Sequence, residues 1–380
     1  MLTMIAFVVG MSELIVGGIL DLIANDLQVR VSTAGLLITV FAFVFAISSP
    51  ILLVTFAKAE RTRLISFALV IFFIGNIVAI FSGNFAWLLL SRIISAASGS
   101  IAVVLSINLA SRIVEPAYRG RAIGLVVMGI SGSLVLGLPI GVFLGNMIDW
   151  RAPFVLTAVL TILLLIGANM TLQKVKPSQV VTLKEQLATL KNKQILFAHA
   201  TTFFFLAGHF TFYGYLTPYA KSILNFDGMT ISILYLLYGI AAVSGGGLAG
   251  ITSDRFGIKK TLLASVFVLA VSLFLIPFTT NVLIFFWILL IVWGVVSWGI
   301  TPPIQSHLFE IAPETSDIQQ SLNNAALQLG IAFGTLFGSF VIETRSISET
   351  AHFGIIFVVL SFVAAIITMQ RRLPEQVHQT

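Results

Sequence analysis

Long, mostly apolar stretches separated by short polar loops fill this chain of 380 residues. A helix needs ~20 such residues to cross the hydrocarbon core of a membrane, whereas the strands of a membrane barrel run ~10 residues with alternating polarity. The stretches are too long and too uniformly apolar for strands. We therefore predict an all-α membrane protein with twelve transmembrane helices, over residues 2–24, 33–56, 64–83, 86–111, 121–146, 152–171, 194–219, 229–252, 260–279, 281–309, 319–343 and 350–370.

The composition argues against a soluble protein of any class. Only 9% of the residues are charged and 58% are hydrophobic, whereas a soluble chain carries about 25% charged residues. So few charged side chains cannot cover a water-facing surface. The absence of cysteine also excludes disulfide frameworks, thiolate metal sites and cysteine nucleophiles.

The basic loop residues predict the orientation in the membrane. When the loops are counted alternately from the N-terminus, sixteen lysines and arginines fall on the side of that terminus and four on the other side. Basic residues concentrate in cytoplasmic loops. We therefore expect both termini to lie in the cytoplasm. The membrane is expected to be the plasma or inner membrane of a bacterium. The net charge of +6 then reflects this bias rather than nucleic-acid binding.

The longest polar segment, residues 172–193, divides the chain after the sixth span. We predict an N-terminal six-helix bundle over 1–171, a cytoplasmic linker over 172–193 and a C-terminal six-helix bundle over 194–380. Within the linker, the apolar spacing from Thr182 to Leu190 fits a short amphipathic helix on the membrane surface. A solvated linker without a helix is the alternative.

Glycines spaced four residues apart occur in the fifth and eleventh spans, and such spacing lets a second helix approach closely. The two sets are offset by 193 residues, and the loops after the second span of each half by 197. Similar offsets indicate parallel six-helix repeats, an arrangement of transporters with a site between two bundles. The glycines are Gly137, Gly141, Gly145, Gly330, Gly334 and Gly338.

Two segments resemble the major facilitator superfamily. The loop from Gly250 to Lys260 reads GITSDRFGIKK and matches the superfamily pattern GxxxDRxGxKK. The segment GLPIG at 137–141 is similar to its antiporter motif, which implies export. The resemblance also implies two six-helix bundles that alternate access to a central cavity, no cofactor and a monomer. It assigns conformational gating to Gly137, Pro139, Gly141, Asp254, Arg255 and Gly257.

In that reading, Asp254 belongs to a latch between helices that stabilises the outward-open state. A merely basic inner loop is the alternative, and the carboxylate of Asp254 argues against it. The N-terminal copy of the loop has Ala57 at the equivalent position, so the same role is not expected there.

Further stretches resemble one branch of the superfamily. The sequence SELIVGGIL at 12–20 is similar to the drug:proton antiporter branch, which includes sugar and purine exporters, although Asp21 stands where that branch usually has proline. The stretches at 206–211, 311–321 and 325–332 resemble bacterial purine efflux pumps. This resemblance implies that purine bases or nucleosides are the substrates.

Glu13 and Arg92 are charged residues well inside predicted spans, where a charge costs ~2.5–3.5 kcal/mol. Glu13 lies near the middle of the first span and Arg92 lies inside the fourth. At ~1.5 Å per residue both fall in the outer half of the membrane. We predict that Glu13 carries the coupled proton and that Arg92 pairs with it or with substrate. A static structural ion pair is the alternative.

Five polar or aromatic residues are candidates for substrate binding. His209 and Tyr213 lie one helical turn apart and share a face, which suits stacking and edge hydrogen bonds to a flat heterocycle such as a purine. Trp298 lies on the tenth span, near the pair Pro302-Pro303 that is expected to bend it. Asn324 and Gln328 lie on the eleventh span. Helix packing and bonding between helices are the alternatives for all five.

The chain lacks the sequence patterns of an enzyme. There is no phosphate-binding pattern GxxxxGK[ST], and no histidine and carboxylate set has metal-ligand spacing. The segment 245–250 formally matches GxGxxG, but it follows no strand. We therefore expect no metal, no cofactor and no ATP hydrolysis.

The leading hypothesis is a proton-coupled exporter of purine bases or nucleosides. A broader exporter of drugs or sugars is the second hypothesis, since the same branch contains both. A membrane enzyme or a sensor that does not transport is the third. It is disfavoured because no catalytic cluster exists beyond Glu13 and Arg92 and no soluble domain is attached.

Overall fold

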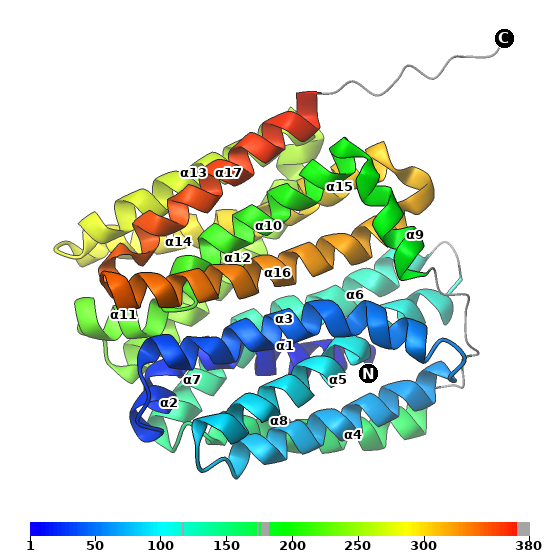
Figure 1. Cartoon of the computed structure of the whole chain (residues 1–380), viewed down its shortest axis with the longest axis horizontal. Coiled ribbons are helices and arrows are strands. Elements are labelled where there is room, and N and C mark those ends of the chain that lie inside the picture. The colour runs from blue at the N-terminus through cyan, green and yellow to red at the C-terminus, as the bar shows by residue number, and fades with distance from the viewer. Residues whose placement is uncertain (116–117, 173–174, 176–181, 371–380) are drawn as a thin grey trace.

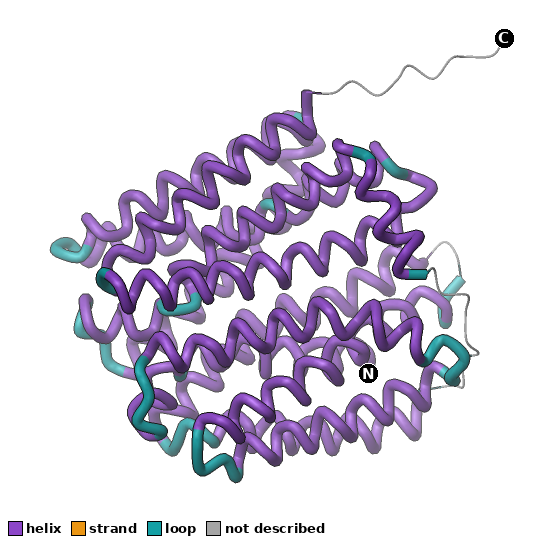
Figure 2. Tube along the Cα trace, viewed as in Figure 1, coloured by secondary structure: helices purple, strands orange, loops and turns teal. Residues whose placement is uncertain are grey.

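The computed structural model describes residues 1–115, 118–172, 175 and 182–370. All regular structure in these residues is helical (Figure 2). Helices form because a segment in hydrocarbon must satisfy its own backbone N–H and C=O groups. Eleven helical segments are long and apolar enough to cross a membrane, and a bent pair at the N-terminus makes a twelfth. The predicted all-α membrane class with twelve spans is confirmed.

The first half of the chain forms six spans, which lie together in the lower part of Figure 1. They are α1 (Leu2–Gly18) with α2 (Leu20–Asp26), α3 (Val31–Thr55), α4 (Arg61–Ile80), α5 (Phe85–Arg112), α6 (Arg119–Gly132) continued by η2 (Ser133–Gly137) and α7 (Leu138–Met147), and α8 (Ala152–Thr171).

The second half forms six more spans, which lie in the upper part of the same view. They are α10 (Lys193–Tyr213) with α11 (Leu216–Ile223), α12 (Gly228–Phe256), α13 (Ile258–Leu275) with η4 (Ile276–Thr279), α14 (Leu283–Gly299) with α15 (Thr301–Ile311), α16 (Ser316–Thr344), and α17 (Thr350–Gln370). Short elements lie between them: α9 (Leu183–Ala188), η3 (Thr189–Lys191), η5 (Pro313–Thr315) and η6 (Ile347–Glu349).

Breaks divide several spans at glycine or proline. The axes of α1 and α2 differ by 64° at the break after Gly18. The tenth span breaks after Gly299, and Pro302 and Pro303 begin the next helix, where missing N–H groups cost least. The interruption falls at Ile300, just before the double proline, and the expected bend itself stays a prediction.

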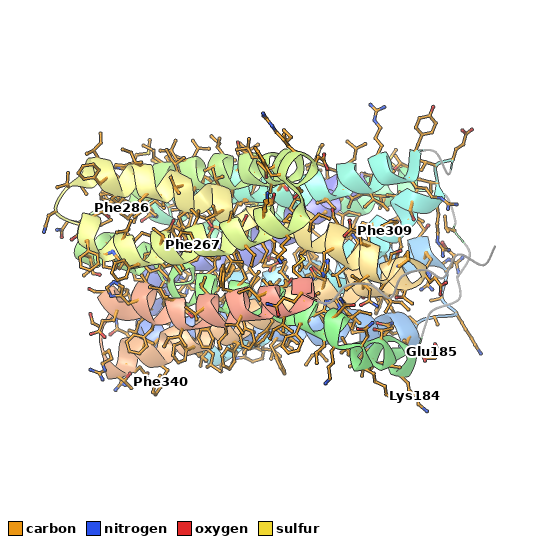
Figure 3. All side chains as sticks on the ribbon, turned by 90° about the horizontal axis from the view of Figure 1, so that it is seen from above. Lys184, Glu185, Phe267, Phe286, Phe309 and Phe340 are labelled. Atoms are coloured by element: carbon orange, nitrogen blue, oxygen red, sulfur yellow. The ribbon has the colours of Figure 1, made fainter. Side chains whose placement is uncertain are left out.

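Large apolar side chains cover the flanks of the bundle. Phe267 and Phe340 are each 60% exposed and are labelled in Figure 3. A soluble protein rarely exposes such a continuous apolar surface. The flanks therefore suit contact with lipid, whereas polar residues gather at the ends and inside the bundle.

Within each half, a stripe of glycines lets two helices pack closely, and the two pairs are equivalent. A side chain added at Gly141 of α7 would overlap Ile15 of α1, and one added at Gly334 of α16 would overlap the backbone of Ala207 in α10. The fifth span therefore packs on the first as the eleventh packs on the seventh. This confirms the close approach that the spacing of the glycines predicts.

Candidate functional site

A cavity of about 1890 Å³ lies between the two halves. Leu183, Leu187 and Leu190 border one end of it, and Glu13 and Tyr213 border the other, toward the C-terminal ends of α1 and α10. The cavity exceeds the ~300–1,000 Å³ of common ligand pockets. A small molecule would therefore occupy only part of it, and the deep end offers the most enclosed surface.

The short helix α9 stands at the mouth of the cavity. It begins with a reciprocal cap, in which the Thr182 hydroxyl accepts from the Glu185 N–H and the Glu185 carboxylate accepts from the Thr182 N–H. The Thr182 N–H and hydroxyl both donate to the Glu185 carboxylate, and these two bonds lower its pKa. The linker therefore contains the predicted helix, whose place on the membrane surface stays a prediction. Figure 3 places Lys184 and Glu185 at this end of the bundle, which we call the linker end.

The opposite end of the bundle, which we call the far end, is closed by contacts between the halves. Lys221 of α11 forms an ion pair with Asp21 of α2 at 2.6 Å and donates to Asn146 of α7 at 3.1 Å. Ser339 of α16 donates to the Ser32 carbonyl of α3 at 2.9 Å. The sequence analysis did not identify these contacts, since nothing in the spacing relates residues two hundred positions apart.

Glu13 lies at the deep end of the cavity and contacts the other half of the protein. The Gln328 amide Nε2 of α16 donates to Glu13 Oε1 at 2.9 Å. Both residues border the cavity. The structure thus brings together the predicted proton carrier and one predicted substrate contact, and their hydrogen bond joins the two halves next to the space where cargo would bind.

Arg92 does not form the predicted direct pair with Glu13. Its side chain is buried away from the cavity lining, donates to the Ser12 hydroxyl at 3.4 Å and lies over the Phe41 ring at 4.1 Å. Ser12 and Glu13 are neighbours in α1 and point about 100° apart, so a guanidinium beside Ser12 misses the carboxylate. Arg92 therefore acts on Glu13 only as a charge at longer range.

His209 uses both ring nitrogens inside the protein. The Trp293 indole N–H can only donate, and it donates to His209 Nδ1 at 3.1 Å. Nδ1 is therefore unprotonated, and Nε2 carries the hydrogen that faces the Tyr238 hydroxyl at 3.2 Å. Tyr238 in turn donates to Ser297 at 2.7 Å. A neutral imidazole held in this way offers cargo its ring surface rather than a hydrogen bond.

Tyr213 stacks on His209, with ring centroids 5.0 Å apart and an angle of 22° between the rings. Its hydroxyl is buried and has no hydrogen-bond partner in the described part of the chain. The five predicted substrate contacts all border the cavity: His209, Tyr213, Trp298, Asn324 and Gln328. Their roles stay predictions, and two of them, Tyr213 and Gln328, carry a buried oxygen without a hydrogen-bond partner among the described residues.

Trp293, Tyr238 and Asn323 are structural polar groups that the sequence analysis did not single out for the site. Asn323 donates to the Thr202 hydroxyl of α10 at 2.8 Å. This amide therefore bonds one helix to another. Aromatic residues and amides are frequent in these spans, and only the third dimension separates those facing the cavity from those facing a helix.

The predicted gating residues lie outside the cavity lining. Gly257 has φ of 91° between α12 and α13, a conformation that favours glycine. Arg255 lies over the neighbouring Phe256 ring at 5.3 Å, and Asp254 is exposed without an ion pair in the described residues. A latch that closes the linker end would be released in a structure open at that end.

Gly137 and Gly141 pack against α1, and Pro139 is the second residue of α7, which follows η2, a turn of π-helix. Such turns frequently occur at functional sites. The antiporter-like segment therefore lies where α7 meets α1, the helix that carries Glu13. A change in this packing would move the carboxylate, which fits a gating role.

Comparisons with protein families and curated proteins point to transporters. The family model of the Major Facilitator Superfamily matches residues 2–335, and again 198–380. An uncharacterised MFS-type transporter of Bacillus subtilis is 32% identical over 366 residues, 96% of this chain and 94% of that protein. A probable sugar efflux transporter of Helicobacter pylori is 29% identical over 350 residues, 92% and 89% of the two chains.

Solved structures show the same fold at low sequence identity. A bacterial homologue of the human lysosomal transporter Spinster is 15% identical with a TM-score of 0.78, covering 97% of this chain and 95% of that one. A D-xylose-proton symporter is 16% identical with a TM-score of 0.78, covering 97% and 96%.

Proposed function

Because the chain belongs to the major facilitator superfamily, we propose that it is a secondary exporter that couples the entry of protons to the expulsion of small neutral organic molecules. The observation that carries this proposal is the position of Glu13, a titratable group at the deep end of the cavity that is hydrogen-bonded to the other half of the protein. A transporter of this kind needs no cofactor and performs no enzymatic step. We further propose that it works as a monomer in the plasma membrane of a bacterium.

Protonation of Glu13 would change the bond that joins the halves. A charged carboxylate accepts strongly from the Gln328 amide N–H, because bonds to ionised groups are the stronger kind. A neutral carboxyl accepts weakly and has a hydrogen to donate, and the Gln328 amide oxygen is buried and free to accept it. The two protonation states therefore favour different arrangements of α1 and α16, which shifts the population between two conformations.

The open end of the cavity is proposed to face the cytoplasm. The linker end carries the excess of lysine and arginine predicted to be cytoplasmic, and the far end is held shut by Lys221 and Asp21. The structure then corresponds to an inward-open state that is ready to take up cargo from the cytoplasm. Release would require the far end to open and the linker end to close.

Purine bases and nucleosides are the proposed cargo. They are flat, polar at the edge and uncharged near neutral pH. Tyr213 and Trp298 offer aromatic rings to the cavity, and Asn324 adds an amide. A site built to bond a polar edge rejects analogues that lack the edge far better than an apolar pocket does.

Sugars are the second candidate, because the Helicobacter pylori relatives are named as probable sugar efflux transporters. In inverted vesicles with an imposed pH gradient, we expect uptake of labelled adenine or hypoxanthine that unlabelled purines inhibit and monosaccharides do not. Uptake of a labelled monosaccharide with no uptake of purine would transfer the proposal to the sugar class. Uptake of unrelated lipophilic cations alone would favour a multidrug exporter.

Substitution of two neighbouring amides distinguishes a role in cargo binding from a role in helix packing. Asn324→Ala is expected to raise the KM for cargo with little change in melting temperature, because Asn324 borders the cavity. Asn323→Ala is expected to lower the melting temperature, because it leaves the buried Thr202 hydroxyl without its donor at a cost of ~1–3 kcal/mol. Transport assays and thermal unfolding of both purified variants test this, and an unchanged KM for Asn324→Ala would remove it from the cargo site.

A further inference from the structure

A second, much smaller cavity lies on the far-end side of Glu13. Its volume is about 20 Å³, and its lining includes Glu13, Gly17, Tyr213 and Tyr235. Gly17 follows Glu13 by one turn along α1, toward the break that leads to α2. Glu13 therefore borders both the large cavity that opens at the linker end and a narrow space toward the far end.

The size and lining of this small cavity suit one water molecule. A water needs at least ~10–15 Å³ and two to four polar partners. Tyr213 contributes a buried hydroxyl that has no partner among the described residues. Glu13 uses Oε1 toward Gln328, so its other oxygen is free for a second bond. A bridging water would satisfy a hydroxyl that otherwise loses free energy through burial.

The donor and acceptor roles of the two hydroxyl groups beyond this cavity, on Thr217 and Tyr235, follow from their partners. Thr217 donates to the Gly18 carbonyl at 3.2 Å, so the hydrogen between Thr217 and Tyr235, 2.9 Å apart, belongs to Tyr235. The oxygen of Tyr235 is thus left to accept from the cavity. The chain ends at a carbonyl oxygen, which cannot pass a proton on, so the cavity has no continuous hydrogen-bonded path to the far end in this conformation.

We propose that this cavity binds a single water that bridges the Glu13 carboxylate and the Tyr213 hydroxyl and delivers protons to Glu13 from the far end. This inference rests on the proposed proton coupling. Once the far end opens, a proton from solvent adds to the water while one of the water's own protons passes to a Glu13 oxygen. The water is regenerated and the carboxylate becomes neutral. A space of this size admits a proton carrier and excludes cargo, so the two solutes reach Glu13 from opposite sides.

Filling the cavity is the first test. A methyl group at Gly17 would lie 3.7 Å from Ile38, an ordinary contact, so Gly17→Ala fits while occupying the space of the water. Gly132→Ala is the matched control, because its methyl would lie 3.5 Å from Phe7 and Gly132 borders neither cavity. We expect Gly17→Ala to slow transport driven by a pH gradient about tenfold with unchanged cargo affinity, and Gly132→Ala to transport normally.

Removing the Tyr213 hydroxyl is the second test, and it can be carried out even if Gly17→Ala does not fold. Tyr213→Phe, assayed at saturating cargo, is expected to slow gradient-driven transport about tenfold. Tyr219→Phe is its control, since the Tyr219 hydroxyl is also buried without a partner in the described residues but borders neither cavity. A structure that resolves ordered waters should show one peak within hydrogen-bond distance of Glu13 and Tyr213.

Glu13→Gln in the same assay separates two failures. If Glu13→Gln is inactive while Gly17→Ala and Tyr213→Phe transport at the wild-type rate, the water site is refuted and the coupling role of Glu13 stands. If Glu13→Gln transports at the wild-type rate, the proposed function fails and the water site fails with it. An empty cavity in the solved structure overturns the water site by itself.

Discussion

Glu13→Gln is expected to abolish export driven by a pH gradient, so that the rate falls to that of vesicles without protein. Cargo is still expected to bind. Glutamine keeps the size of the side chain and a carbonyl oxygen that can accept from Gln328, so the contact between α1 and α16 persists. It cannot take up or release a proton, so the two conformations no longer respond to the gradient. Reconstituted vesicles with an imposed pH gradient measure the effect.

A matched carboxylate outside the site controls for the change of charge. Glu115 is exposed in the loop after α5 and borders neither cavity, so Glu115→Gln is expected to export at the wild-type rate. Cargo binding to Glu13→Gln should stay within a few-fold of the wild type. Gradient-driven export at the normal rate in Glu13→Gln would assign the proton to another residue.

Lys221→Ala is expected to open the far end. The change leaves Asp21, whose side chain is 13% exposed, as a nearly buried carboxylate without its partner. Breaking a fully buried pair in this way costs ~3–5 kcal/mol, and the 26% exposure of Lys221 lowers that cost. A change of ~5.5 kcal/mol inverts a population from 1:99 to 99:1. The loss of the pair should therefore raise the fraction of outward-open molecules substantially.

Spin labels can follow this opening directly because the chain contains no cysteine. Cysteines introduced at the exposed positions Asn25 and Arg345 report the distance between the halves at the far end. We expect a longer distance in Lys221→Ala and partial return in the double variant Asp21→Asn with Lys221→Met, which removes both charges. Identical distance distributions in the wild type and Lys221→Ala would show that the pair does not hold the far end shut.

The fold could be predicted from the sequence because the bilayer constrains it through few properties. Apolar length fixed the spans, and glycines at 137, 141, 330 and 334 marked the helix faces that pack closely. These properties are local, and the repeat places them twice in one chain. Breaks such as the one after Gly18 escaped prediction, since they depend on how α2 packs over the far end.

The site could be predicted only as a set of residues. The cost of charge in a membrane singled out Glu13, and helical spacing placed His209 with Tyr213. The partner of Glu13 is Gln328, 315 residues away, rather than Arg92. Neighbouring residues such as Ser12 and Glu13 face different helices, and a sequence does not tell which of them a distant side chain meets.

The central claim is that cargo leaves in exchange for a proton that Glu13 carries. Vesicles that contain the protein and a trapped pH-sensitive dye test it most directly, with cargo added on one side and no other gradient. Wild-type protein should move protons opposite to the cargo, and Glu13→Gln should move none. Cargo movement without proton movement in the wild type, or proton movement that persists in Glu13→Gln, would contradict the claim.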